Sequence, residues 1–272
     1  MAHKQLIIPI FIPFGGCPHQ CVFCDQKGIS AVRELPEPTE AARQIELYLS
    51  TWKGKGAREA AFYGGSFTGL PEKTQKDYLE AALPFIRDGR LDSIRVSTRP
   101  DYIDVQRAVF LLHNGVRTVE LGVQSMDPKV LALSGRGHGP DATIAAVAAL
   151  KDAGLKVGLQ FMPGLPGDSI ETILDTTQKI IALKPDFVRV YPSLVLKGTA
   201  MHRMYLGGLY SPWGLEEMTE ACVQVKRLLD EAGVPVIRMG LQPGKELEES
   251  IAAGPYHPSF RQLVEALATS KN

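Results

Sequence analysis

The 272-residue chain has no excess of charge of either sign, no long apolar run and few cysteines. Its 30 lysines and arginines balance 30 aspartates and glutamates, so no overall field attracts nucleic acid. No apolar stretch approaches the roughly 18 residues of a membrane-spanning helix, and no secretory signal pattern follows Met1. We therefore expect a cytoplasmic protein with no membrane partner. In that reducing compartment, clustered cysteines indicate metal or redox work rather than disulfides.

The cysteines are unevenly placed. The chain has four, and three of them, Cys17, Cys21 and Cys24, form a C-x3-C-x2-C pattern directly after an apolar, strand-like run. Three thiolates in one loop can bind three irons of a 4Fe–4S cluster and leave the fourth iron open to a small molecule. A zinc site completed by His19 is the alternative, although structural zinc motifs favour paired C-x2-C knuckles. Cys222 lies in the apolar stripe of a helical pattern, which indicates core packing.

Strand-like and helical patterns alternate along the chain, which implies parallel strands joined by right-handed crossovers. We predict an α/β fold, a partial (β/α)6 TIM-type barrel over residues 1–240, with residues 241–272 as a C-terminal extension packed on the same domain. An open doubly wound sheet is the alternative. Val234–Met239 is a candidate seventh strand. The six expected strands are Leu6–Pro13, Glu59–Tyr63, Ser93–Thr98, Thr118–Val123, Lys156–Met162 and Phe187–Tyr191.

Single residues predict some helix boundaries. Pro84 should end or kink the helix that starts near Pro71, because proline lacks an N–H and clashes with the preceding turn. Asp168 and Glu171 resemble a capping box at the start of a later helix.

The unusual residues fall at the carboxyl ends of the expected strands. In a parallel barrel these ends share one rim, and that rim carries the active site. The sequence therefore predicts one large site. Its segments are the cysteine loop, Gly64-Gly65-Ser66-Phe67-Thr68, Ser97-Thr98-Arg99, Gly122-Val123-Gln124-Ser125, Met162 to Gly167 and Tyr191-Pro192-Ser193.

Taken in order, these segments resemble the radical S-adenosylmethionine (SAM) superfamily and, within it, the radical-SAM domain of the Elongator catalytic subunit. The resemblance covers roughly residues 6–240 and rests on the cysteine loop and on YGGSFTG, STRPDYI, VELGVQS, SGRGH and YPSLVLKGT. Oxygen-independent coproporphyrinogen oxidases share GVQS and GLPG more loosely. Two departures stand out. The Elongator-type chain continues into an acetyltransferase domain, whereas this one stops at Asn272, and Ser97 replaces the subgroup's usual glutamate.

The resemblance implies that the cysteine loop holds a 4Fe–4S cluster and that SAM binds its open iron. Gln124 would then contact the SAM ribose and Arg136 the SAM carboxylate. The full set of SAM-binding positions carried over is Phe23, Gly64, Gly65, Ser66, Ser97, Gln124, Arg136, Gln160 and Met162.

The resemblance also implies an enzyme that cleaves SAM reductively to a 5′-deoxyadenosyl radical, using a reductant such as ferredoxin or flavodoxin. A tRNA or other RNA base is one candidate substrate, and a porphyrin-like or other small molecule is the alternative. A non-catalytic iron–sulfur or zinc protein that binds RNA or transfers electrons is the competing class. The oligomeric state stays open.

A few basic and aromatic residues are candidates for substrate contact, with ordinary solvation as the alternative. Arg99, Tyr191 and Lys197 follow expected strands. Lys53 and Lys55 begin a small basic loop whose functional interpretation is contact with RNA phosphates.

Overall fold

The structure is a computed structural model and describes residues 5–13, 15–17, 21–25 and 34–270. Its main sheet is parallel and contains seven strands in the order β1-β2-β3-β4-β5-β6-β8. The sheet order follows the chain without the reversal of a doubly wound sheet, so the predicted partial barrel is confirmed, together with the candidate seventh strand. The strands are β1 (Leu6–Phe11), β2 (Arg58–Tyr63), β3 (Ser93–Thr98), β4 (Val116–Gln124), β5 (Lys156–Phe161), β6 (Phe187–Val190) and β8 (Val236–Met239).

Two compact units divide the chain. Unit 1 contains Met1–Pro18, Val32–Leu121 and Ala145–Val157, and unit 2 contains His19–Ala31, Gly122–Ile144 and Gly158–Asn272. The boundary expected at residue 240 stays a proposal. Among the described residues, no helix combines the length and apolar character needed to cross a bilayer.

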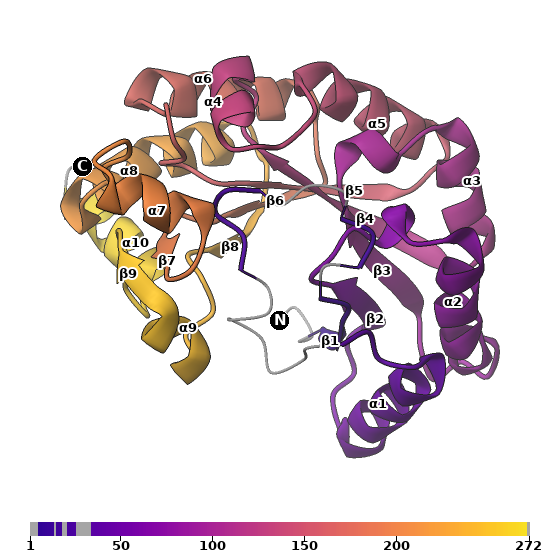
Figure 1. Cartoon of the computed structure of the whole chain (residues 1–272). Coiled ribbons are helices and arrows are strands. Elements are labelled where there is room, and N and C mark those ends of the chain that lie inside the picture. The colour runs from indigo at the N-terminus through magenta and orange to yellow at the C-terminus, as the bar shows by residue number, and fades with distance from the viewer. Residues whose placement is uncertain (1–4, 14, 18–20, 26–33, 271–272) are drawn as a thin grey trace. The chain divides into compact units, whose positions relative to one another are not determined.

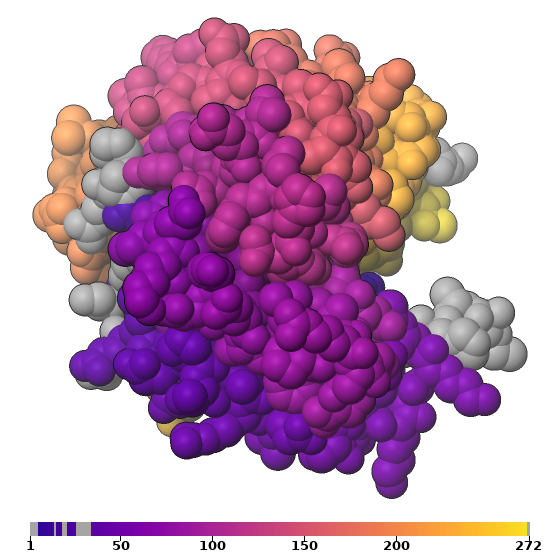
Figure 2. Space-filling view, turned by 90° about the vertical axis from the view of Figure 1, so that its right-hand side faces the viewer, coloured from indigo at the N-terminus to yellow at the C-terminus, as the bar shows by residue number. Residues whose placement is uncertain are grey.

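In unit 1, helices pack on one face of β1–β4, and Figure 2 shows this helical side in indigo and purple. Side chains alternate between the two faces of each strand. Phe62 therefore faces the helices, where its ring centroid lies 5.2 Å from that of Phe67 and 5.6 Å from that of Tyr78. The other elements are α1 (Pro38–Thr51), η1 (Phe67–Gly69), α2 (Glu72–Arg87), η2 (Pro100–Tyr102), α3 (Val105–His113) and part of α5 (Pro140–Asp152).

Helix α2 does not end at Pro84, so the predicted end was wrong, whereas the alternative of a kink at this residue stays a prediction. The helix continues to Arg87, and the Asp88 N–H donates to the Pro84 carbonyl at 3.0 Å. Proline removes one hydrogen bond from the helix. Burial of the apolar face outweighs this loss on both sides of the proline, through Tyr78, Leu79, Ala82 and Phe85.

In unit 2, two helices cover the outer face of β6. Val188 and Val190 are fully buried there, and α6 (Ile170–Ala182) packs against α8 (Leu215–Glu231). Cys222 of α8 is also fully buried, which confirms its predicted core packing. The remaining elements are α4 (Pro128–Leu133), β7 (Val195–Leu196), α7 (Ala200–Leu206), α9 (Lys245–Ser250), β9 (Ile251–Ala253) and α10 (Phe260–Ser270), and β7 pairs with β9 in an antiparallel ribbon.

The cap of α6 differs from the predicted one. Ser169 is the N-cap, and its hydroxyl accepts from the Thr172 N–H at 3.3 Å, while the Ser169 N–H donates to the Thr172 hydroxyl at 2.8 Å. Asp168 and Glu171 therefore do not form the capping box. The Asp168 carboxylate instead accepts from the Gly164 N–H at 2.9 Å, in the loop that precedes the helix.

Candidate functional site

The central contact of the site joins Cys21 to Arg136, which lies 115 residues further along the chain. The Arg136 Nη1 donates to the Cys21 Sγ at 3.2 Å, and its Nη2 donates to the Gly122 carbonyl at the end of β4. Both side chains are buried, at 7% and 5% exposed. Because the thiolate is the form of cysteine that binds metal, a guanidinium at hydrogen-bond distance complements the charge of a ligating sulfur.

Backbone hydrogen bonds fix the rest of the cysteine loop within unit 2. The Cys24 N–H donates to the Cys21 carbonyl at 3.0 Å, and the Val22 N–H donates to the Ser134 carbonyl at 3.1 Å. The Val22 carbonyl in turn accepts from the Met201 N–H at the start of α7. Phe23 packs against a buried cluster made of Val195, Met201 and Tyr210. The loop therefore sits between the end of α4 and the start of α7.

In unit 1, two glycines allow the loop after β1 to approach the loop after β2. A Cβ on Gly16 would lie 2.2 Å from the Ser66 carbonyl oxygen, and a Cβ on Gly65 would lie 2.3 Å from the Gly15 carbonyl oxygen. Gly16 also has a φ of +71°, which side chains disfavour. Cys17 follows this packed backbone directly and is half-buried. Gly64 starts the second loop with a φ of +102°.

The donor set fits an iron–sulfur cluster. The chain has four cysteines, and burial raises the pKa of Cys222 to about 12, so its thiol stays protonated inside unit 2. This leaves the three loop cysteines as thiolate donors. Across the described residues, no three His, Cys, Asp or Glu side chains converge as a ready-made metal site. His19, the alternative zinc ligand, lies outside the described residues.

Gln124 shows the features of a ligand-binding residue. It ends β4 with a φ of +68°, a conformation that non-glycine residues rarely adopt. Its side chain is 6% exposed, and its Oε1 has no hydrogen-bond partner among the described residues. A buried acceptor left without a donor costs roughly 1–3 kcal/mol. A hydroxyl group of a bound molecule would supply that donor, which fits the predicted contact with the SAM ribose.

Two further candidates, Gln160 on β5 and Met162 directly after it, belong to unit 2 as well. The Met162 N–H donates to the Gln124 carbonyl at 2.9 Å, and both Gln160 and Met162 are half-buried. Their contacts with SAM stay predictions.

Ser66 has a structural role in unit 1. Its hydroxyl lies 2.9 Å from the Thr98 hydroxyl and accepts from the Arg99 N–H at 3.1 Å. Since Ser66 is fully buried, any contact with SAM would use its backbone. Ser97 is half-buried beside Glu120 in the sheet register, and its predicted contact stays a prediction.

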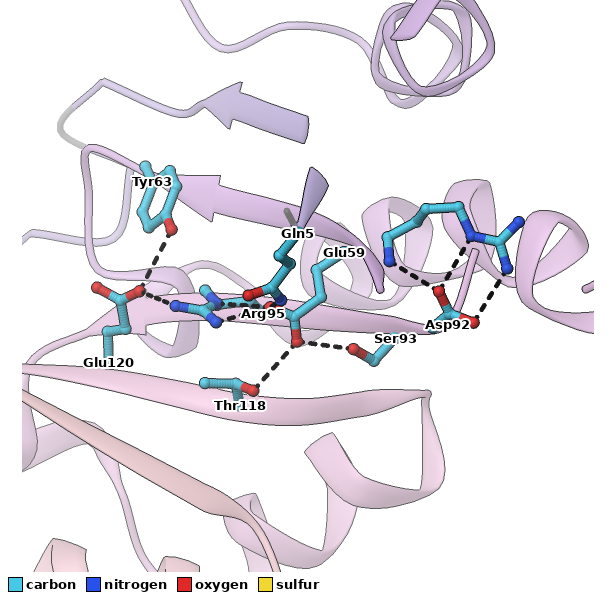
Figure 3. Close-up of polar contacts among 9 residues, drawn as sticks. Gln5, Glu59, Tyr63, Asp92, Ser93, Arg95, Thr118 and Glu120 are labelled. Atoms are coloured by element: carbon cyan, nitrogen blue, oxygen red, sulfur yellow. Dashed lines mark hydrogen bonds and ion pairs between the residues drawn. The ribbon is translucent and has the colours of Figure 1, made fainter. Parts of the chain in front are cut away.

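Sequence reasoning missed a charged network on the inner face of β2, β3 and β4 (Figure 3). The Arg95 guanidinium lies between Glu59, at 2.6 Å, and Glu120, at 2.7 Å, and all three side chains are under 10% exposed. Burial disfavours the charge of Arg95, but the two carboxylates raise its pKa above the ordinary value. The Tyr63 hydroxyl also donates to Glu120 at 3.2 Å. The sequence signal that could have revealed this network is the presence of charged residues within otherwise apolar strand patterns.

Asp168 was assigned only to a helix cap, yet it braces the loop after β5. Its carboxylate accepts from the Gly164 N–H at 2.9 Å and from the Thr172 hydroxyl. The Tyr210 hydroxyl donates to the Gly164 carbonyl at 2.6 Å, so both backbone groups of this glycine are held. Burial raises the pKa of Asp168 from 3.8 to about 6 despite these hydrogen bonds.

The model of the radical SAM superfamily matches residues 11–180, and that of the Radical_SAM C-terminal domain matches residues 185–269. The chain belongs to the radical SAM superfamily. This membership confirms the predicted resemblance, the assignment as an enzyme, and the two cofactors, a 4Fe–4S cluster and SAM.

Relatives with curated names are similar to most of this radical SAM chain. A tRNA uridine(34) acetyltransferase of Methanocaldococcus infernus is 38% identical over 253 residues, which cover 78% of this chain and 47% of the relative. Elongator complex protein 3 of Saccharomyces cerevisiae is 25% identical over 254 residues, which cover 82% of this chain and 45% of the relative. The chain thus spans about half the length of these relatives.

Solved structures agree with the fold of this radical SAM chain. The archaeal Methanocaldococcus infernus Elp3 matches with a TM-score of 0.78 at 25% identity, covering 100% of this chain and 64% of the other. Coproporphyrinogen III oxidase from Escherichia coli matches with a TM-score of 0.62 at 18% identity, covering 85% of this chain and 54% of the other. At 18% identity, the likeness to coproporphyrinogen III oxidase shows only that the two folds are similar.

Replacing Arg95 with methionine should destabilise the protein strongly. The substitution leaves two buried carboxylates without their shared cation, and breaking a buried ion pair costs about 3–5 kcal/mol. Urea unfolding should show this loss. Arg90→Met is the control, because Arg90 pairs with Glu46 at an exposed position, where an ion pair contributes about 1 kcal/mol or less. Equal effects of the two substitutions would contradict the role given to Arg95.

Asp168 should make stability depend on pH. Its pKa is raised in the folded state, so its contribution is fully present below pH 3.8 and is lost as pH rises through about 6. Between these limits the free energy of unfolding should fall by up to about 3 kcal/mol from this group. Unfolding measured from pH 4 to pH 7 should show a flatter dependence for Asp168→Asn. An unchanged slope would show that Asp168 titrates normally.

Proposed function

We propose that this chain carries out radical SAM chemistry on an RNA base, with a uridine of tRNA as the first candidate. The names of the relatives support this choice, since they include tRNA uridine(34) acetyltransferase at 38% identity. Because the chain spans 47% of that relative, the acetyl transfer in its name is not carried over. The proposal covers the radical step and a reductant such as ferredoxin or flavodoxin.

The observation that carries the proposal is the buried contact between Arg136 and Cys21. It sets a cation beside a predicted cluster ligand and ties that ligand to the carboxyl end of β4. The residues that would hold the cluster are Cys17, Cys21 and Cys24. When bound, the cluster and SAM supply one-electron reductive cleavage, whose stable product is 5′-deoxyadenosine.

Several of the residues that would hold SAM belong to unit 2, as this contact does. Gln124 offers a buried amide oxygen to a hydroxyl group, and Arg136 offers a guanidinium that suits a carboxylate. Gln160 lies near the end of β5, and Met162 follows that strand directly. Asp168 and Tyr210 keep the loop after β5 in one conformation, which limits the positions open to a bound molecule.

The unit 1 positions act through their backbone. The space that a Cβ would take at Gly64 and Gly65 is filled by the Phe11 ring and by the Gly15 backbone, so a ligand's amino group would contact the main-chain groups of these glycines. In unit 2, Phe23 packs on the apolar cluster of Val195, Met201 and Tyr210, and it would limit the access of water to the iron–sulfur cluster.

Substitution of the cysteines tests the enzyme assignment. After anaerobic reconstitution with iron and sulfide, dithionite and SAM should give 5′-deoxyadenosine from the unsubstituted chain. Cys24→Ala should abolish the product because it removes a ligand, whereas Cys222→Ala should keep it because Cys222 is buried in α8. A bound zinc ion, a fully reconstituted cluster that leaves SAM intact, or equal behaviour of the two variants would contradict the proposal and favour a non-catalytic protein.

The substrate class is tested separately in cells. We expect RNA from a strain that lacks this gene to contain a nucleoside whose mass differs from that of the parent strain. Restoring the unsubstituted gene should reverse the difference, and the Cys24→Ala gene should not. Unchanged RNA nucleosides together with an accumulated porphyrin-like or other metabolite would contradict the RNA proposal and support the small-molecule alternative.

A further inference from the structure

Gln75 is a polar residue on the buried face of α2 in unit 1, and it is 0% exposed. Burying an amide costs free energy unless its donors and its acceptor find partners. Its Nε2 donates to the Thr68 carbonyl at 3.1 Å and to the Leu70 carbonyl at 2.7 Å. Its Oε1 accepts from the Arg107 Nη1 at 3.3 Å. The amide therefore has one orientation, in which its donors are directed at the backbone of η1 and the residue that follows it.

The two carbonyls that Gln75 binds flank Gly69, where the loop after β2 meets the loop after β1. A Cβ on Gly69 would lie 2.2 Å from the Gly16 carbonyl oxygen, and a Cβ on Gly16 would lie 2.5 Å from the Gly69 carbonyl carbon. The two backbones therefore pack directly on each other. Cys17 follows Gly16 in the chain, so the path of its main chain starts from this contact.

Strand β3 holds the start of η1 through separate contacts. The Thr98 hydroxyl lies 2.6 Å from the Thr68 hydroxyl and 2.9 Å from the Ser66 hydroxyl. The Ser66 N–H in turn donates to the Gly15 carbonyl at 2.6 Å. The start of η1 is thus held by β3, and its end is held by Gln75 of α2.

We propose that Gln75 is a positioning residue for Cys17, one of the three cysteines that would hold the 4Fe–4S cluster. It acts through the backbones of Gly69 and Gly16. Glycine has more conformational freedom than any other residue, so a loop with Gly15 and Gly16 needs outside contacts to present the Cys17 sulfur in one direction. Groups that orient a metal ligand in this way affect metal affinity strongly. This inference rests on the proposed function, in which Cys17 is a cluster ligand.

Iron release tests the proposal without SAM cleavage. The full chain is reconstituted anaerobically, the rate of iron transfer to an Fe²⁺ chelator is measured, and the EPR spectrum of the dithionite-reduced cluster is recorded. Gln75→Met keeps the length of the side chain but removes both donors, so it should release iron about tenfold faster or more and alter the EPR spectrum. Gly69→Ala should act in the same way with Gln75 intact, because its Cβ would meet the Gly16 carbonyl.

Tyr78→Phe is the matched control on the same helix. Tyr78 lies about one turn beyond Gln75 and is also buried, and its hydroxyl donates to the Pro36 carbonyl, outside η1. The substitution removes one hydrogen bond from α2 but leaves the contact at Gly69 in place. Iron release and the EPR spectrum should match those of the unsubstituted chain. Thermal unfolding of each full-length variant shows how much general stability it has lost.

The outcomes separate a positioning role from a general loss of stability. Equal iron release by Gln75→Met and Tyr78→Phe would overturn the proposal, and so would unchanged release in both Gln75→Met and Gly69→Ala. Should Gln75→Met not fold, the comparison of Gly69→Ala with Tyr78→Phe decides in the same way. An unsubstituted chain that loads no cluster would contradict the proposed function. A loaded chain whose iron release ignores Gln75 would overturn the positioning role alone.

Discussion

One buried guanidinium organises the cysteine loop. Arg136 reaches the Cys21 sulfur with one nitrogen and the Gly122 carbonyl with another, so the loop after β1 is fastened to the end of β4 within unit 2. A buried cation is costly unless charged or polar groups surround it. Metal binding needs the anionic form of a cysteine sulfur, and the Arg136 guanidinium lies where it would complement that charge. Backbone hydrogen bonds to Ser134, Met201 and Cys21 hold Val22 and Cys24 beside it, and Phe23 packs on its apolar cluster.

On the inner face of the sheet, away from the cysteines, arginine side chains likewise lie next to charged or polar groups. In unit 1, Arg95 joins Glu59 and Glu120, and three further polar side chains complete the hydrogen bonding of Glu59. In unit 2, Arg189 and Arg238 occupy the same kind of position on β6 and β8. The outer face of each unit is apolar because helices cover it. Because side chains alternate between the two faces of each strand, the outer face carries the apolar residues that stabilise the fold. The inner face carries the polar residues that are available for chemistry.

The strands were predictable because their signals are local. Short strand-like runs between helical patterns predicted six of the strands, and Val234–Met239 predicted the seventh. One expected helix end and one expected helix cap differ in the structure. At Pro84, the burial of the apolar face of α2 outweighed one missing hydrogen bond. At the start of α6, the Asp168 carboxylate accepts from the Gly164 N–H, and Ser169 forms the cap. In both places tertiary packing overrode a local preference.

The sequence alone determined the donor set of three clustered cysteines, the order of strands and helices, and the family. Each of these depends on residue identity and short spacing. Only the tertiary structure decided that Arg136 meets Cys21, that Gln124 carries a buried oxygen without a partner among the described residues, and that Arg189 stands beside Arg238. The first two depend on which distant segments meet, and the third depends on strand register, which shifts within the pairing of β6 and β8. Neither long-range contact nor register leaves a local trace in the chain.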